Sequence, residues 1–134
     1  MSAITAINAA IYSALGASTA LVTALGGTYI YERQAPDDKD LPYVVYSFQG
    51  GGPENISPGN LQSDLVYVRA YAGTPGQDGT IDGYCQTALH RQTLTVTGFT
   101  NIWTAREEDI VLVENPPGGK RIYTAGGIYR IRLS

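Results

Sequence analysis

The fold of this chain is decided at residues 36–46, where the sequence reads Pro-Asp-Asp-Lys-Asp-Leu-Pro-Tyr-Val-Val-Tyr. An acidic loop bounded by Pro36 and Pro42 leads directly into an apolar strand. Because a proline disfavours the helical conformation of the residue before it, the chain must enter this strand in an extended form. β-Branched and aromatic residues favour a strand over residues 43–49, which the glycines at 50–52 are expected to end.

Before this stretch lies a run of residues, 2–31, that carries no charge. Its helical periodicity predicts a first helix capped by Ser2 and ended by Gly16, then a second helix over residues 19–25. The run lacks the basic start of a signal sequence, and its many polar and alanine residues argue against a membrane span. We therefore expect packed helices here and no membrane partner. The expected apolar face of the first helix contains Ile4, Ile7, Ile11, Ala14 and Leu15.

The rest of the chain alternates between extended segments and one further helix. A turn at residues 116–119, Pro-Pro-Gly-Gly, is expected to join the last two strands into an antiparallel hairpin. A capping box from Thr74 to Gln77 predicts a helix over residues 75–91. The apolar face of that helix contains Ile81, Tyr84, Cys85, Ala88 and Leu89. Further strands are predicted at residues 28–33, 61–72, 94–99, 102–115 and 121–133.

This order of elements predicts a single α+β domain over residues 1–134. The expected architecture is an antiparallel or mixed β-sheet, with the N-terminal helices and one central amphipathic helix packed on one face. In the strand over residues 61–72, both faces carry apolar or aromatic residues. We therefore expect helices on one side of the sheet and protein, or a partner, on the other.

Composition excludes several classes of function. A hydrophobic content of 43% and a charged content of 16% indicate a globular protein. The net charge of -3, without any basic run, argues against nonspecific nucleic-acid binding. The one cysteine, Cys85, can form neither an intramolecular disulfide nor a metal framework. That favours a reducing compartment, although a secreted protein without disulfides would have the same composition.

The motifs that superficially resemble catalytic or cofactor sites fail on spacing. Residues 118–120, Gly-Gly-Lys, lack the first glycine of a phosphate loop, because Glu114 stands at its position. The glycines at 50–52 lead into a loop and not into the helix that a dinucleotide requires. Cys85 and His90 lie five positions apart, about 140° around a helix, so they cannot meet on one face. We expect no catalytic residue, no cofactor and no metal.

Two surface features are candidates for contact with another subunit. Acidic residues cluster at 37–40 and 107–109 without the spacing of a calcium loop, and they are expected to be exposed. Their alternative role is to meet an arginine of a neighbouring subunit. Gly76, Gly79 and Gly83 form a stripe opposite the apolar face of their helix. Glycine inside a helix is unfavourable, so this stripe indicates either a tolerant surface or close approach of a neighbouring protomer.

Taken in order, the elements resemble the tail completion (tail terminator) proteins of long-tailed bacteriophages. The resemblance covers essentially the whole chain and lies in the order and spacing of its elements. The helix with the glycine stripe departs from the pattern, which has an Ala-rich turn there. The matching features are an Ala/Leu-rich opening helix to Leu25, the strand Tyr29-Ile30-Tyr31, the Ala35-Pro36 loop into Leu41-Pro42-Tyr43-Val44-Val45-Tyr46, a long strand ending Tyr71-Ala72, a helix with Ala88-Leu89 and the last strand Ile128-Tyr129-Arg130-Ile131.

The resemblance implies a structural virion protein without catalysis. Such a subunit assembles into a ring, usually six-fold, at the head-proximal end of the tail tube, where it ends tube polymerisation. Its partners would be copies of itself, the tail tube protein and a neck or head-completion protein. Genomic DNA would pass through the lumen without specific binding, and assembly would take place in the bacterial cytoplasm.

If the chain forms such a ring, the contacts are expected to come from its loops and edges. The candidate interface residues are Arg33, Asp37, Asp38, Asp40, Glu54, Asn55, Gly79 and Gly83. Another head-to-tail connector or neck adaptor is the nearest alternative role. A small α+β ligand-binding domain outside phages is the alternative from another class, and an enzyme ranks third because no catalytic geometry can be nominated.

Overall fold

The computed structural model describes residues 3–37, 39–53, 61–115 and 119–134. Across these residues the five strands form one mixed sheet in the order β1-β2-β3-β5-β4. β1 pairs with β2 in parallel, and every other pairing is antiparallel. The predicted α+β class is confirmed. The elements are α1 (Ala3–Gly16), α2 (Thr19–Leu25), β1 (Ile30–Glu32), β2 (Tyr43–Pro53), β3 (Gln62–Ala72), α3 (Gln77–Leu89), β4 (Asn101–Glu114) and β5 (Ile122–Leu133).

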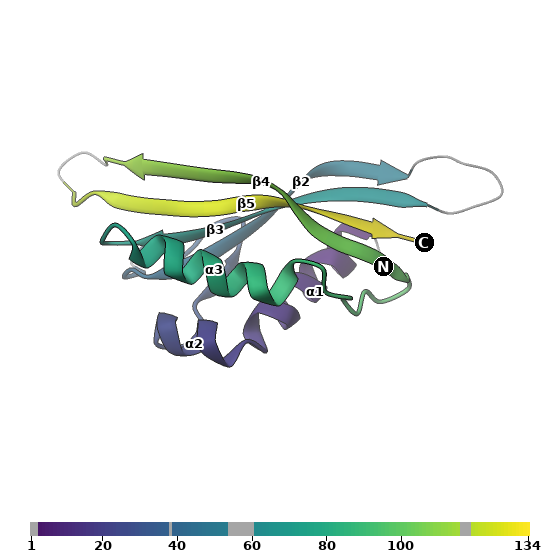
Figure 1. Cartoon of the computed structure of the whole chain (residues 1–134), viewed down its shortest axis with the longest axis horizontal. Coiled ribbons are helices and arrows are strands. Elements are labelled where there is room, and N and C mark those ends of the chain that lie inside the picture. Colours follow the sequence, from purple (N-terminus) through teal and green to yellow (C-terminus); the bar gives the residue numbers. More distant parts are fainter. Residues whose placement is uncertain (1–2, 38, 54–60, 116–118) are drawn as a thin grey trace.

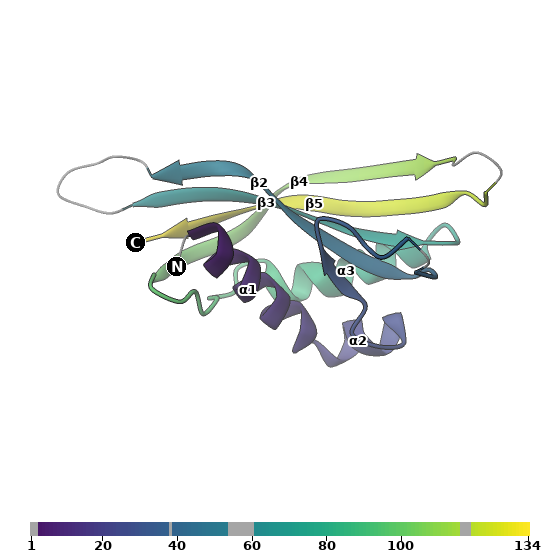
Figure 2. The ribbon, with the colours of Figure 1, turned by 180° about the vertical axis from the view of Figure 1, so that it is seen from behind.

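All three helices lie on the same face of the sheet, as predicted (Figure 1; Figure 2 shows the view from behind). The core lies between them and the sheet, and side chains from every helix and every strand except β4 enter it. In β3 the alternation predicted from sequence holds, since Val66, Val68 and Ala70 are buried beneath the helices. Among the described residues no single helix could span a membrane by length and hydropathy; α1 and α2 meet those criteria only as a pair, bent by 80°.

The N-terminal helices end where the sequence predicts, but α1 presents a different face. Gly26 adopts a left-handed conformation (φ 80°) and its amide closes the last turn of α2. In α1, however, Ile4 is 44% exposed, whereas Ala6 and Ala10 are buried. The buried face of α1 is therefore rotated away from Ile4 and toward the alanines, compared with the face predicted from sequence. The small side chains of the two alanines let the helix backbone approach its neighbours closely, which large residues at those positions would prevent.

Helix α3 begins later than predicted, at Gln77, and it ends at Leu89. The expected capping box is wrong. The N-cap residue is Gly76, in a left-handed conformation (φ 90°) that makes no side-chain cap. Asp78 supplies the cap from inside the first turn, because its Oδ1 accepts from the amides of Gly76 (3.1 Å) and Gly79 (2.8 Å). A carboxylate at this end of a helix is also favoured by the helix dipole.

Two predictions about strands are corrected. Strand β2 does not end at Gln49 but continues through the three glycines to Pro53, with a bulge between Phe48 and Gly50. A Cβ at Gly51 would collide with the backbone of Ser63 in β3, so the glycine allows the strands to pair rather than breaking them. Residues 94–99 form a loop and not a strand. Their alternation is real, because Leu94 and Val96 are buried, but they reach the core without joining the sheet.

The two long hairpins leave the body in opposite directions. In Figure 1 the β2–β3 hairpin points to one end of the molecule and the β4–β5 hairpin to the other. The predicted β4–β5 pairing is confirmed, with Glu114 opposite Ile122 and Asn101 opposite Leu133. The start of α1 and the C-terminus lie toward the end that carries the β2–β3 hairpin (Figure 1).

Candidate assembly surface

A buried arginine fixes α3 to the β4–β5 hairpin. The side chain of Arg106 in β4 is 6% exposed, and its Nη1 lies 2.8 Å from Oδ1 of Asp82 in α3. Its Nε donates to Asp109 Oδ1 (2.6 Å) and its Nη2 to the carbonyl oxygen of Gly126 (2.7 Å). Burial by itself would lower the pKa of Arg106, but the hydrogen bonds to Asp82 and Tyr129 and their charges raise it above its usual value. The guanidinium is therefore a permanently charged clamp between helix and hairpin.

The residue types that could have served catalysis make structural contacts instead. Nδ1 of His90 accepts from the backbone amide of Arg106 (2.9 Å), so this nitrogen holds the end of α3 against β4. Cys85 is fully buried, and burial raises the pKa of its thiol. The prediction that Cys85 packs in the core is confirmed. Within the described ranges, no group of three or more His, Cys, Asp or Glu residues is placed to hold a metal ion.

The acidic loop brings some of the predicted interface residues to the surface. Arg33 adopts a left-handed conformation (φ 65°), and its side chain, 75% exposed, pairs with Glu32 at 2.7 Å. Asp37 and Asp40 are exposed, and Gln34 donates to Asp37. The other predicted loop residues fall outside the described part of the chain: Asp38, Glu54 and Asn55.

Arg33 and Asp37 line a shallow polar cleft of about 320 Å³. Its floor is the open face of the sheet, where Tyr43 and Tyr71 stack with ring centroids 5.0 Å apart. Glu114 of β4 also lines this cleft. Asp40 does not line this cleft.

The predicted glycine stripe lies at the surface of α3. Gly79 and Gly83 are exposed, and a Cβ built on either residue would have no neighbour within 4 Å. Gly76 precedes the helix rather than belonging to it. The stripe is thus two residues long, faces away from the core, and has room for a side chain.

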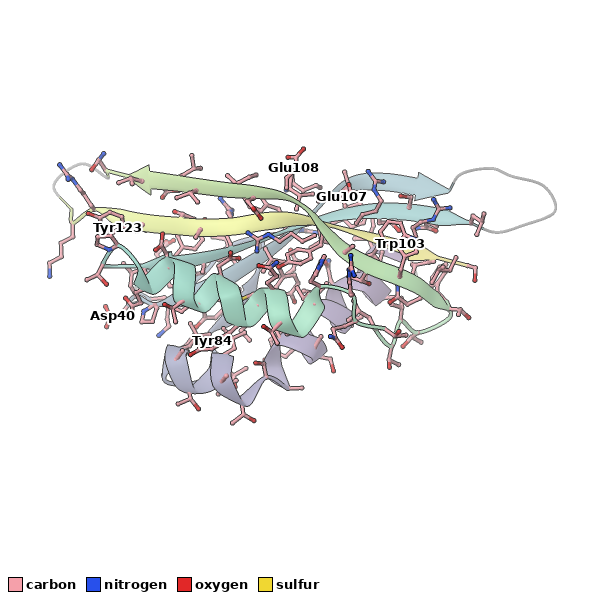
Figure 3. The ribbon with its side chains drawn as sticks, in the orientation of Figure 1. Asp40, Tyr84, Trp103, Glu107, Glu108 and Tyr123 are labelled. Atoms are coloured by element: carbon pink, nitrogen blue, oxygen red, sulfur yellow. The ribbon has the colours of Figure 1, made fainter. Side chains whose placement is uncertain are left out.

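The sheet face opposite the helices carries tyrosines and arginines. Arg69 lies between two tyrosine rings, with its guanidinium carbon 4.9 Å from the centroid of Tyr67 and 5.3 Å from that of Tyr71. Across the sheet, Arg130 pairs with Glu107 at 2.9 Å. Figure 3 shows Glu107 rising from β4 on this open side. Tyrosine and arginine are enriched at protein interfaces, so this composition fits a face that meets protein.

Strand β4 forms one edge of the sheet and ends in an exposed apolar segment, which we call the apolar tip: Val111, Leu112 and Val113. These side chains are 71%, 49% and 51% exposed. The register places Val111 and Val113 on the helix side of the sheet and Leu112 on the open side. An apolar edge of this kind is unusual on an isolated soluble protein, because it invites association with another chain.

A second apolar feature lies at the other end of the sheet. This open surface groove, which we call the end pocket, has a volume of about 390 Å³ and a lining that is mainly apolar. It opens beside the start of α1 and under the β2–β3 hairpin. Its lining residues are Ala3, Ile4, Phe48, Gly51, Gly52, Gln62, Asp64 and Phe99.

Sequence reasoning missed both of these surfaces and the arginine clamp. The sequence did contain a pattern that could have revealed the apolar tip. Residues 110–113, Ile-Val-Leu-Val, break the alternation of polar and apolar residues expected of a strand with one exposed face. No sequence pattern could have revealed the end pocket, because α1, β2, β3 and the loop before β4 come together only in the folded protein. Arg106 precedes an acidic run, and nothing in its sequence neighbourhood indicated that its side chain would be buried.

The comparisons with known proteins agree with this architecture. The model of the family described as "Tail completion protein gp17" matches residues 9–121. A chain from a solved structure titled "Virion of native gene transfer agent (GTA) particle" aligns with a TM-score of 0.80 at 15% identity, covering 98% of this chain and 97% of that one. A second solved chain aligns with a TM-score of 0.57 at 9% identity, covering 97% and 94%. No curated protein sequence matches significantly.

The structural matches establish the fold, and the family match shows to which family the chain belongs. That match covers the second half of α1, all of α2 and α3, the acidic loop, and strands β1 to β4. The chain therefore belongs to the tail completion protein gp17 family and is a structural protein of a phage tail.

Proposed function

We propose that this protein forms a ring at the head-proximal end of the tail tube, where it ends polymerisation of the tube and joins the tail to the neck. The observation that carries the proposal is the family match over residues 9–121. The shape of the subunit supports it, because the open face, the β4 edge and the apolar tip together leave more interaction surface than an isolated monomer needs.

The partners that this role requires are further copies of the chain, the tail tube protein and a neck protein. We place Arg33, Asp37 and Asp40 among the contact residues, since they lie exposed on the loop beside the polar cleft. Gly79 and Gly83 are contact candidates on a different surface. The DNA would pass through the lumen without specific binding. Each subunit would be a single domain over residues 1–134, assembled into the virion in the host cytoplasm.

The test is the solution mass of the purified protein by light scattering, combined with negative-stain imaging with and without tail tube protein. Rings, alone or on tube ends, and tubes of limited length are the expected result. Subunits that neither form rings nor bind tube ends would overturn the proposal. Binding to neck components in the absence of tube binding would indicate the neck-adaptor role instead.

A further inference from the structure

We propose that the apolar tip of one subunit inserts into the end pocket of the next, so that a head-to-tail contact between identical copies builds the ring. This inference rests on the proposed function and names the surfaces that would carry it. The occupant of the pocket is a second copy of this chain.

The tip is exposed on both faces of its strand. Val113 points to the helix side and Leu112 to the open side, and about half of each side chain is in contact with solvent. Packing one face of the hairpin against a flat partner would cover only one of these residues. Seating of the tip in an apolar groove would remove more of both side chains from water, and burial of apolar surface favours association.

The end pocket has the chemistry that matches the tip. Phe48 and Phe99 pack against the core cluster and also line the pocket, so its walls are supported from behind. Ile4 lies at its mouth and is 44% exposed. A volume of about 390 Å³ falls within the range of clefts that hold a small molecule, and it can therefore admit a few apolar side chains.

The tip of a subunit cannot reach its own pocket. Val113 of the tip pairs with Tyr123 near the start of β5, whereas Gln62 of the pocket pairs with Leu133 at the other end of that strand. Tyr123 and Leu133 are ten residues apart, which at about 3.3 Å per residue places them roughly 33 Å apart. Two different patches at opposite ends form a heterologous contact, and such a contact generates rings when its rotation closes.

The charges near the tip and in the end pocket give a second, independent argument for this contact. Asp64 lines the end pocket and is fully buried, and its Oδ2 has no hydrogen-bond partner among the described residues. Its Oδ1 accepts from Gln62 at 3.3 Å. Lys120 and Arg121 are exposed just before β5, and residues 123–125 of that strand pair with the tip. An incoming tip would therefore bring cations toward a buried carboxylate that lacks a donor.

Three single substitutions at exposed positions test the contact. Val113→Asp places a charge in the tip, and Ile4→Asp places one at the mouth of the pocket. Ile102→Asp is the matched control, because Ile102 is an apolar residue of β4 with 47% exposure that belongs to neither surface. Circular dichroism would establish that all three remain folded. We expect the first two to abolish rings, with or without tail tube protein, and the control to form rings like the parent.

Mixing the two defective variants separates a head-to-tail contact from a symmetric one. Val113→Asp retains an intact pocket and Ile4→Asp retains an intact tip, so together they should form dimers that cannot grow further. A chain carrying both Ile4→Cys and Val113→Cys should oxidise to a ladder of covalent multimers that ends at the ring. Either single-cysteine variant alone should give no ladder. The native Cys85 is fully buried and should not take part.

The outcomes distinguish this contact from the function on which it rests. Rings that persist in both Asp variants, or a double-cysteine chain that gives no ladder, would overturn the contact while leaving a ring function intact. A ladder without binding to tube ends would support the contact and contradict the terminator role. Loss of tube binding in Ile4→Asp, with normal binding in Val113→Asp, would show that the pocket receives the tube protein and would overturn the inference.

Discussion

At the scale of the residue, Arg106 determines how the β4–β5 hairpin is held. Its guanidinium joins Asp82 of α3 to the backbone of Gly126 in β5, with its side chain almost completely removed from water. A Cβ on Gly127 would collide with this guanidinium, so the glycine makes the space that the arginine occupies. One charged group and one missing side chain thus set the angle between helix and hairpin.

We expect Arg106→Met to lower the free energy of unfolding by up to about 3–5 kcal/mol, because it leaves the Asp82 carboxylate, whose side chain is only 13% exposed, without its partner. Adding Asp82→Leu should recover most of that loss, since a buried ion pair can often be replaced by apolar residues at little cost. Urea unfolding of the parent, both single variants and the double variant would measure the coupling. Additive effects of the two substitutions would contradict a direct pair.

A second prediction at this scale concerns Asp64, whose pKa burial raises above the ordinary value for an aspartate. A carboxyl with a raised pKa binds its proton more tightly in the folded state, so folding is favoured at low pH. That contribution is lost as the pH rises from the ordinary aspartate value through the raised one. Each unit of raised pKa corresponds to about 1.4 kcal/mol. Asp64→Asn should therefore gain stability relative to the parent as the pH rises above about 4, the ordinary aspartate value.

Thermal unfolding across this pH range, under conditions in which the protein is monomeric, is the measurement. Asp40→Asn provides the control for loss of one carboxylate at an exposed position. A melting-temperature difference between Asp64→Asn and the parent that stays constant with pH would contradict the prediction.

At the scale of the element, α3 is a helix whose outer surface is not optimised for stability. Gly79 and Gly83 each lack the side chain that would favour the helical state, and both have room for one. We expect Gly79→Ala and Gly83→Ala each to raise the stability of the monomer by up to about 1 kcal/mol. Gly126→Ala should do the opposite, because its Cβ would collide with the backbone of β3. Denaturant unfolding of the three variants would check the contrast.

Larger substitutions at the same two glycines would test their role in assembly separately from their effect on stability. If the stripe faces a neighbouring protomer, Gly79→Leu with Gly83→Leu should prevent ring formation although the monomer remains folded. Normal rings from this double variant would show that the stripe is a tolerant surface and would remove both residues from the interface.

Local patterns were sufficient to predict most elements, because caps, periodicity and turns act within a few residues. The end of α2 at Gly26 and the antiparallel pairing of β4 with β5 agree with the prediction, whereas residues 116–118 of the predicted turn lie outside the described part of the chain. The errors arose where a tertiary contact decided the outcome. Gly51 lies in a strand because the backbone of Ser63 in β3 passes too close to leave room for a side chain. Leu94 reaches the core from a loop, where its backbone amide donates to the side chain of Asn101 at 2.8 Å.

At the scale of the whole molecule, the candidate interface could be predicted only in outline. The sequence pointed to Arg33, Asp37 and Asp40 as exposed, and the structure places them at the surface. It could not show that the apolar tip and the end pocket lie at opposite ends of one sheet. That relation depends on the register of β5 with both β3 and β4, and sequence patterns do not encode a distance between two hairpins.

The acidic loop and the apolar tip would contribute to assembly through different forces, and salt can separate them. We expect Asp37→Lys with Asp40→Lys to leave the fold intact, because both side chains are exposed, but to weaken ring formation. Interactions between exposed charges are largely screened beyond about 8 Å at physiological ionic strength, whereas burial of apolar surface is not. In the parent, the part of assembly due to the loop should therefore weaken as salt rises.

Light scattering over a series of sodium chloride concentrations would measure this dependence for the parent and for the double variant. The parent should lose affinity between low and high salt until it approaches the charge-reversed variant, which should itself respond weakly. Val113→Asp should fail to assemble at every salt concentration, because the surface it removes is apolar. Equal assembly of the parent and the charge-reversed variant at low salt would exclude Asp37 and Asp40 from the ring contact and leave the tip and end pocket as its main source of affinity.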